Sequence, residues 1–281
     1  MKQSFYAFIL VFSLLFCGCS SNTPTPETTS ITVPPVVEPT ASETTVATEL
    51  ITEPTIDPNS LQIDAGTFLN KFIDPVSDHY LEYYTFIPEK AVKDMPLIIF
   101  LHGDGETHKI DALERIALVE NAKEYYGEEF PFIAIAPGLR QKSWCEGLVP
   151  RTLLALIEDT ASRYEIDRNK IIITGFSRGA IGTWYYITNH TDIFSCAVPV
   201  SCPNEYPVLY HNLKEVPIWG FVGEKEEYYS QKMAEIINWT SEIGGDAKLS
   251  VIEDMSHTGM DKAAYTQETI EWMLTQNKEK K

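Results

Sequence analysis

The stretch KIIITGFSRGA, Lys170 to Ala180, decides the fold. Its β-branched run, Ile171 to Thr174, is typical of a strand buried on both faces. The small residues Gly175 and Gly179 permit a very tight turn from this strand into a helix. Ser177, at the centre of the Gly-x-Ser-x-Gly pattern, would then sit on a strained backbone with its hydroxyl exposed above the sheet. The stretch therefore predicts a strand, a turn with a nucleophilic serine and the start of a helix; the alternative is a chance match in a loop.

Strand and helix patterns alternate on both sides of this stretch. The predicted strands span residues 80–87 (an edge strand), 96–101, 130–136, 171–174, 194–200, 216–222 and 247–253, and the predicted helices span 111–125, 150–164, 178–189, 228–243 and 261–276. Such alternation argues for the α/β class, with a mostly parallel sheet and helices on both of its faces. In such a sheet the site lies at the carboxyl ends of the strands.

The N-terminal segment has the layout of a secretory signal. Lys2 is followed by an apolar run over residues 5–16 and then by Cys17, Gly18 and Cys19. The sequence LFCGC resembles the end of a bacterial lipoprotein signal, which implies cleavage after Gly18 and lipidation of Cys19. We therefore expect a signal peptide at 1–18 and a cell-surface lipoprotein anchored in a bacterial membrane. Plain secretion after cleavage nearby is the alternative.

Residues 19–60 have the composition of a disordered tether. The segment is rich in Thr and Pro, carries scattered Glu and has no Lys or Arg, so it lacks the apolar surface needed to offset the entropy of ordering. Much of the formal net charge of −18 belongs to the rest of the chain. Nucleic acid is therefore an unsuitable partner. A single folded domain is expected over residues 61–281.

Three cysteines lie in the predicted domain: Cys145, Cys196 and Cys202. In an oxidising compartment one pair can form a disulfide. We expect Cys145 and Cys202 as that pair, because both lie in loops beyond the carboxyl ends of strands; the alternative is three thiols. The cysteine and histidine spacings match no zinc site.

A nucleophilic serine needs an imidazole to take its proton. Three histidines follow Ser177 in the chain. His190 ends a helix, and His211 precedes a strand and so lies at the wrong edge of the sheet. His257 follows the strand 247–253 at the carboxyl edge. We therefore predict His257 as the base, with a solvent-exposed loop histidine as the alternative.

The imidazole in turn needs a carboxylate, which should lie in the loop after the strand 216–222. That loop reads GEKEE. Glu226 is the choice, with Glu227 and Glu224 as rivals and a solvated run of charges as the alternative interpretation. Asp254 lies too near the histidine in sequence to be the usual partner, although it can substitute for one.

Two backbone N–H groups are expected to bind the oxyanion of the transition state. One belongs to Arg178, directly after the nucleophile. The other belongs to Asp104, in the loop LHGDGE that follows the strand 96–101. His102 in the same loop is expected to be a structural turn residue rather than a base.

Four separated blocks resemble the α/β-hydrolase group of polyhydroxybutyrate depolymerases, feruloyl esterases and acetylxylan esterases, which includes lipoprotein members and predicted peptidases. The likeness covers nearly all of residues 68–276, and its blocks are LHGDGE, DRNKIIITGFSRGA, VPIWGFVGEKEE and GGDAKLSVIEDMSH. It implies that Ser177 is the nucleophile and His257 the base. In that group the acid of the triad is usually an aspartate in a His-Gly-x-x-Asp loop. In this chain Val222 stands in place of the histidine and Glu226 in place of the aspartate.

The sequence thus predicts a serine hydrolase that cleaves feruloyl, acetyl-carbohydrate or polyester substrates without a metal or organic cofactor. Substrate choice is expected in the loop 140–148, where Trp144 offers an aromatic face unless it is a core plug, and at Arg178. One alternative is a peptidase of the same fold. Another is a tethered, catalytically inactive surface-binding protein. The expected partners are a small-molecule or polysaccharide-linked ester and the membrane that holds Cys19.

Overall fold

The computed structural model describes residues 60–278, apart from residues 62, 142 and 205–209. The predicted signal peptide, Cys19 and all but the last residue of the predicted tether lie outside the described residues. Within the described part of the chain, no helix is long and apolar enough to cross a membrane.

One eight-stranded sheet organises the chain, in the order β1-β2-β4-β3-β5-β6-β7-β8. The strands are β1 (Gly66–Ile73), β2 (Tyr80–Ile87), β3 (Leu97–Leu101), β4 (Ile133–Pro137), β5 (Ile171–Phe176), β6 (Cys196–Val200), β7 (Ile218–Gly223) and β8 (Ala247–Ile252). Strands β1 and β2 run antiparallel to their neighbours, and the others are parallel. The predicted α/β class with a mostly parallel sheet is confirmed.

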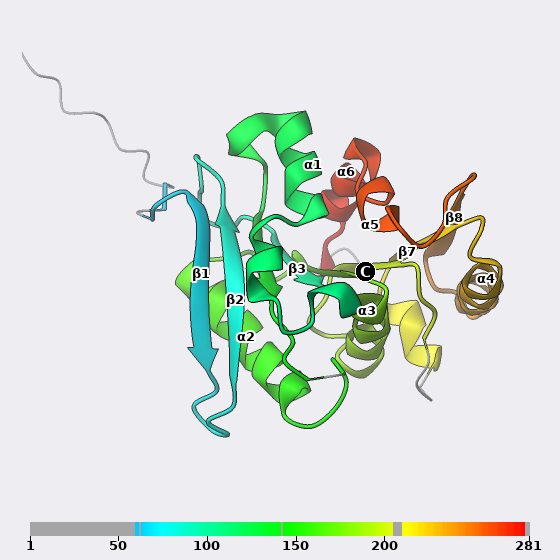
Figure 1. Cartoon of the computed structure of the whole chain (residues 1–281), viewed down its shortest axis with the longest axis horizontal. Helices are drawn as coiled ribbons and strands as arrows, with labels where there is room; N and C mark the ends of the chain where they lie inside the picture. Colours follow the sequence, from blue (N-terminus) through cyan, green and yellow to red (C-terminus); the bar gives the residue numbers. More distant parts are fainter. Residues whose placement is uncertain (1–59, 62, 142, 205–209, 279–281) are drawn as a thin grey trace, which may run out of the picture. The chain divides into compact units, whose positions relative to one another are not determined.

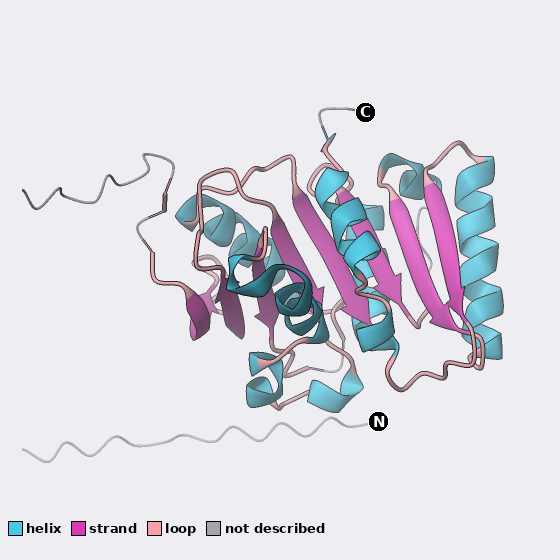
Figure 2. Cartoon of the chain, turned by 90° about the horizontal axis from the view of Figure 1, so that it is seen from above, coloured by secondary structure: helices cyan, strands magenta, loops and turns pink. Residues whose placement is uncertain are grey.

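Helices cover both faces of this sheet (Figures 1 and 2). One apolar core joins the sheet to α2 (Val149–Arg163), α3 (Arg178–Asn189) and α4 (Glu227–Glu242). A second core, on the opposite face, joins it to α1 (Ala117–Tyr126), α5 (Met260–Ala263) and α6 (Gln267–Thr275). Since both faces are packed, the central strands are continuous apolar runs rather than alternating ones.

Strand β5 lies in the middle of the sheet, between β3 and β6. Ile173 pairs with Ile99 of β3 on one side and with Ala197 of β6 on the other. All three are completely buried. The run of isoleucines therefore positions the turn that follows β5 at the centre of the carboxyl edge.

Several predicted boundaries are wrong. Strand β1 was not predicted, because it is a largely exposed edge strand without a continuous apolar run; β2 is consequently an inner strand. The predicted helix 111–125 begins as a 3-10 turn, Ile110–Glu114, and extended backbone at Arg115 and Ile116 separates this turn from α1. The predicted helix 261–276 divides into α5 and α6, because the Thr266 hydroxyl caps a new helix start.

Candidate active site

Ser177 occupies a strained turn between β5 and α3, with φ 56° and ψ −119°. This left-handed φ is disfavoured for a non-glycine residue. Glycines on each side make the turn possible: a Cβ added at Gly179 would lie 1.8 Å from the Leu101 carbonyl oxygen, and one added at Gly175 would lie 2.4 Å from the Gly179 backbone. The predicted strand, turn and helix are therefore present, and the turn lifts the serine from the sheet edge.

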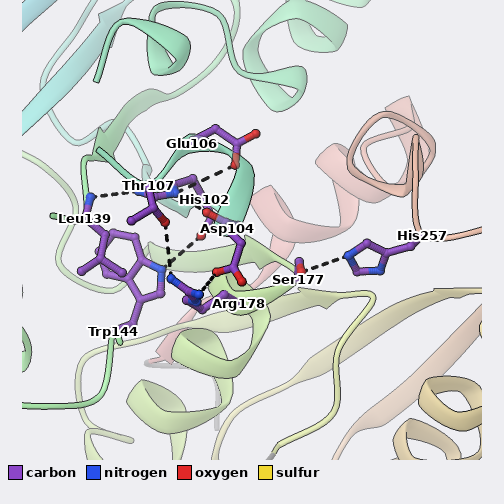
Figure 3. Close-up of polar contacts among 10 residues, drawn as sticks. His102, Asp104, Glu106, Thr107, Leu139, Trp144, Ser177, Arg178 and His257 are labelled. Atoms are coloured by element: carbon purple, nitrogen blue, oxygen red, sulfur yellow. Dashed lines mark hydrogen bonds and ion pairs between the residues drawn. The ribbon is translucent and has the colours of Figure 1, made fainter. Parts of the chain in front are cut away.

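His257 reaches Ser177 from the loop after β8 (Figure 3). The Ser177 hydroxyl donates a hydrogen bond to His257 Nε2 across 2.9 Å. On the other side of the ring, Nδ1–H donates to Glu226 Oε1 across 2.6 Å. A neutral imidazole with its proton on Nδ1 satisfies both contacts, and this tautomer can accept the serine proton.

Glu226 is the carboxylate that the fold brings to the histidine. It is the N-cap residue of α4 and is 7% exposed. Its Oε2 accepts two hydrogen bonds of 2.7 Å, one from the Ser201 hydroxyl and one from the Gly223 N–H. The rivals Glu224 and Glu227 are exposed; Glu224 accepts a hydrogen bond from the Asp254 N–H instead. Asp254 forms an ion pair with Lys225.

Ser201 was not predicted to belong to the site. It directly follows β6 and has a left-handed φ of 57°. One sequence signal could have indicated that Ser201 belongs to the site. It directly follows the strand next to β5, and the carboxyl ends of parallel strands meet at one edge of the sheet. The hydroxyl holds the oxygen of Glu226 that His257 does not use.

The loop after β3 lies against the serine turn. A Cβ added at Gly103 would lie 3.3 Å from the Ser177 Cβ, a tight contact, so the glycine helps the two loops to approach this closely. Asp104 follows, at the start of a 3-10 turn, and its carboxylate forms an ion pair with the Arg178 guanidinium. Arg178 also donates a 3.4 Å hydrogen bond to the Thr107 hydroxyl. The fold thus brings together the two residues whose N–H groups were predicted to bind the oxyanion.

No family model and no curated protein matches the chain. Among solved structures, a thermostable esterase is 26% identical with a TM-score of 0.64, over 75% of this chain and 63% of its own. The feruloyl esterase module from Clostridium thermocellum complexed with sinapinate is 14% identical, with a TM-score of 0.59 over 75% of this chain and 88% of its own. An S-formylglutathione hydrolase from Staphylococcus aureus is 17% identical, with a TM-score of 0.59 over 77% of this chain and 100% of its own. The chain is an α/β-hydrolase by fold.

These neighbours agree with the resemblance to the esterase group of α/β-hydrolases. The chain spans only 63% of the length of the thermostable esterase. The two neighbours of lower identity support the fold alone.

His102 has a structural place in this fold. Its Nδ1–H donates to the Gly103 carbonyl across 2.6 Å, and its Nε2 accepts from the Leu139 N–H across 2.9 Å. Burial lowers the pKa of His102 to about 4. The neutral ring therefore joins the loops after β3 and β4, and neither nitrogen is available as a base.

The expectation that Trp144 offers an aromatic face to substrate is wrong. Trp144 is 1% exposed, and its indole N–H donates to the His102 carbonyl across 3.1 Å. The Tyr186 hydroxyl donates to the Trp144 carbonyl across 3.0 Å. The alternative interpretation, a core plug, describes the residue: the ring packs under the loop after β3 (Figure 3).

The expected Cys145–Cys202 disulfide does not form, because Cys145 is a thiol. Burial raises the pKa of this thiol to about 12, so it stays protonated and is a poor nucleophile. Among the residues that the structure describes, no group of His, Cys, Asp and Glu side chains is arranged to hold a metal ion.

Proposed function

We propose that the chain is a serine hydrolase that cleaves carboxylic esters through an acyl-enzyme. The observation that carries this proposal is the unbroken series of hydrogen bonds from Glu226 through His257 to Ser177. The thermostable esterase among the structural neighbours supports the same reaction class. Because Glu226 meets the histidine at hydrogen-bond distance, an active enzyme is favoured over the inactive binding protein.

In this mechanism Ser177 attacks the ester carbonyl while His257 takes its proton. Negative charge develops on the carbonyl oxygen, which the N–H groups of Arg178 and Asp104 bind. His257 then protonates the leaving alcohol, and water frees the acyl group in a second, similar step. Glu226 keeps the imidazole in the required tautomer and stabilises its charged form.

Hydrolysis of p-nitrophenyl acetate and methyl ferulate tests the proposal directly. We expect wild-type turnover and a loss of roughly a thousandfold or more in Ser177→Ala and in His257→Ala. A fluorophosphonate probe should label the wild type and leave Ser177→Ala unlabelled. Equal rates in wild type and Ser177→Ala would overturn the nucleophile. Turnover of peptide amides without turnover of esters would favour the peptidase alternative.

We also propose that the enzyme is exported and tethered to a membrane through Cys19. The support is the signal-like sequence 1–18 and the polar segment that follows it. Incorporation of labelled palmitate into wild type and Cys17→Ser, but not into Cys19→Ser, is the expected result. Release of the wild type without label would support plain secretion instead.

A further inference from the structure

Aromatic rings flank His257 in a continuous row. The Phe176 ring centroid lies 4.8 Å from that of the imidazole. Tyr229 lies 6.0 Å from the imidazole, and Tyr228 lies 5.8 Å from Tyr229. These separations are within the range over which aromatic rings attract one another. Since Tyr228 is 64% exposed, the row leads from the serine turn out to solvent.

The two tyrosines follow closely in sequence on the carboxylate that binds His257. Both lie in the first turn of α4, after Glu226 at the N-cap and Glu227 at the first helical position. Glu226 is fixed to Ser201 and Gly223. The first turn of α4, which carries both tyrosines, is therefore joined to His257 through Glu226. Tyr228 keeps most of its surface in contact with water, which leaves its ring available to a ligand.

The reaction determines which part of an ester would meet these rings. His257 must reach the leaving oxygen with Nε2 to protonate it. Figure 3 shows Ser177 between His257 on one side and Arg178 with Asp104 on the other. The carbonyl oxygen therefore turns toward Arg178 and Asp104, and the alcohol part leaves along the His257 side.

We propose that Tyr228 and Tyr229 form a subsite for the alcohol part of the substrate, and that this alcohol is neutral and carries a ring. The inference rests on the proposed ester hydrolysis. A planar aromatic or pyranose ring can stack on a tyrosine face, whereas a short alkyl alcohol covers little of it. Trp144 is buried and cannot offer an aromatic face to the substrate, so in this proposal the two tyrosines offer it instead.

Charge around the tyrosines selects against an anionic alcohol. Glu224, Glu227 and Asp254 are exposed there. Lys225 is paired with Asp254 at 2.6 Å, and Lys232, one helical turn after Tyr228, is paired with Glu235 at 2.7 Å. A carboxylate on the alcohol would meet like charges, which disfavour its binding.

Acetate esters that differ only in their alcohol test the proposal: ethyl acetate, benzyl acetate, an acetylated methyl pyranoside and 4-(acetoxymethyl)benzoate. In Tyr228→Ala and Tyr229→Leu we expect kcat/KM for the two neutral ring esters to fall roughly 3- to 10-fold, mainly through KM. Ethyl acetate should change less than about twofold. In the wild type, kcat/KM for 4-(acetoxymethyl)benzoate should be lower than for the two neutral ring esters. In Glu227→Gln this kcat/KM should rise.

Tyr125→Ala is the matched control, because Tyr125 is another exposed tyrosine, on α1. It should leave all four esters unchanged. Equal losses on every ester, or none on the ring esters, would overturn the subsite. Binding of benzyl acetate to Ser177→Ala, measured by ligand-observed NMR, separates this inference from the reaction. If benzyl acetate binds only when Tyr228 is present but the wild type hydrolyses no ester, the proposed function is wrong and the subsite stands. If benzyl acetate binds equally well without Tyr228, the subsite is wrong.

Discussion

At the scale of single residues, the length of the Glu226 side chain matters. One oxygen serves His257 while the other is held by Ser201 and Gly223. An aspartate at this position is one methylene shorter and cannot span both sets of partners without a shift of α4. We expect Glu226→Asp to lower kcat roughly 100-fold through misplacement of the imidazole. We expect Glu226→Gln to lower it roughly 10⁴-fold, because an amide no longer enforces the tautomer.

Steady-state kinetics with p-nitrophenyl acetate check this prediction. Glu224→Gln is the matched control, since Glu224 lies in the same loop but is exposed and does not contact the histidine. Its kcat should stay near that of the wild type. A loss in Glu224→Gln equal to that in Glu226→Gln would show that the loop charge, rather than the contact, is what matters.

Ser201 is predicted to be a positioning residue. Removing its hydroxyl leaves a buried carboxylate oxygen with one donor fewer, and we expect Ser201→Ala to lower kcat roughly tenfold with KM unchanged. Ser201→Gly also lacks the hydroxyl but relieves the left-handed backbone at φ 57°. Thermal denaturation should therefore rank Ser201→Gly above Ser201→Ala in stability, while both keep the low kcat. Recovery of kcat in Ser201→Gly would mean that backbone strain, not the hydroxyl, is what affects the rate.

At the scale of elements, one ion pair joins the start of α3 to the loop after β3. Arg178 and Asp104 contribute both the side chains of this pair and the N–H groups proposed for the oxyanion. Because the guanidinium is only 23% exposed, we expect Arg178→Gln and Asp104→Asn each to lower kcat roughly 2- to 5-fold. The losses should not add in the double variant, since either change already breaks the contact.

A boronic acid inhibitor provides the second measurement for this pair, because it places an oxygen where the oxyanion forms. Its affinity should fall in parallel with kcat. Arg168→Gln, which breaks the exposed pair with Glu158, is the matched control and should change neither quantity. Fully additive losses of kcat in the double variant would contradict the proposed role of the Arg178–Asp104 ion pair.

The same scale shows what sequence patterns can and cannot reveal. Strand β5 and its turn can be predicted from a local pattern, because few other local structures fit the Ile171–Thr174 run followed by two glycines. The proximity of His257 and Glu226 to Ser177 follows from strand order, because parallel strands bring their loops to one edge. The roles of Ser201 and Trp144 depend instead on packing. Ser201 contacts Glu226 because of its φ angle and its hydrogen bond. Trp144 is withdrawn from the surface because it is buried against His102. No local pattern encodes these relations.

At the scale of the whole molecule, a buried histidine couples the stability of the fold to pH. His102 is 1% exposed and its pKa is lowered from 6.5 to about 4 by burial. Below pH 6.5 the unfolded chain binds a proton at this residue that the folded chain does not, so the folded state loses stability as pH falls toward 4. The total effect is on the order of 3 kcal/mol. Asp74 extends the trend to lower pH: hydrogen bonds from the Ser77 hydroxyl and the Val76 N–H hold its pKa at about 2.

Urea unfolding measured from pH 7 to pH 4 tests this coupling. The free energy of unfolding of the wild type should fall across that interval. In His102→Gln it should fall less, because glutamine does not titrate, although its value at pH 7 should be lower since one of the two backbone contacts is lost. His211→Gln, at an exposed position, is the matched control and should follow the wild type. If His102→Gln kept the full wild-type dependence on pH, the acid sensitivity would have to come from other groups.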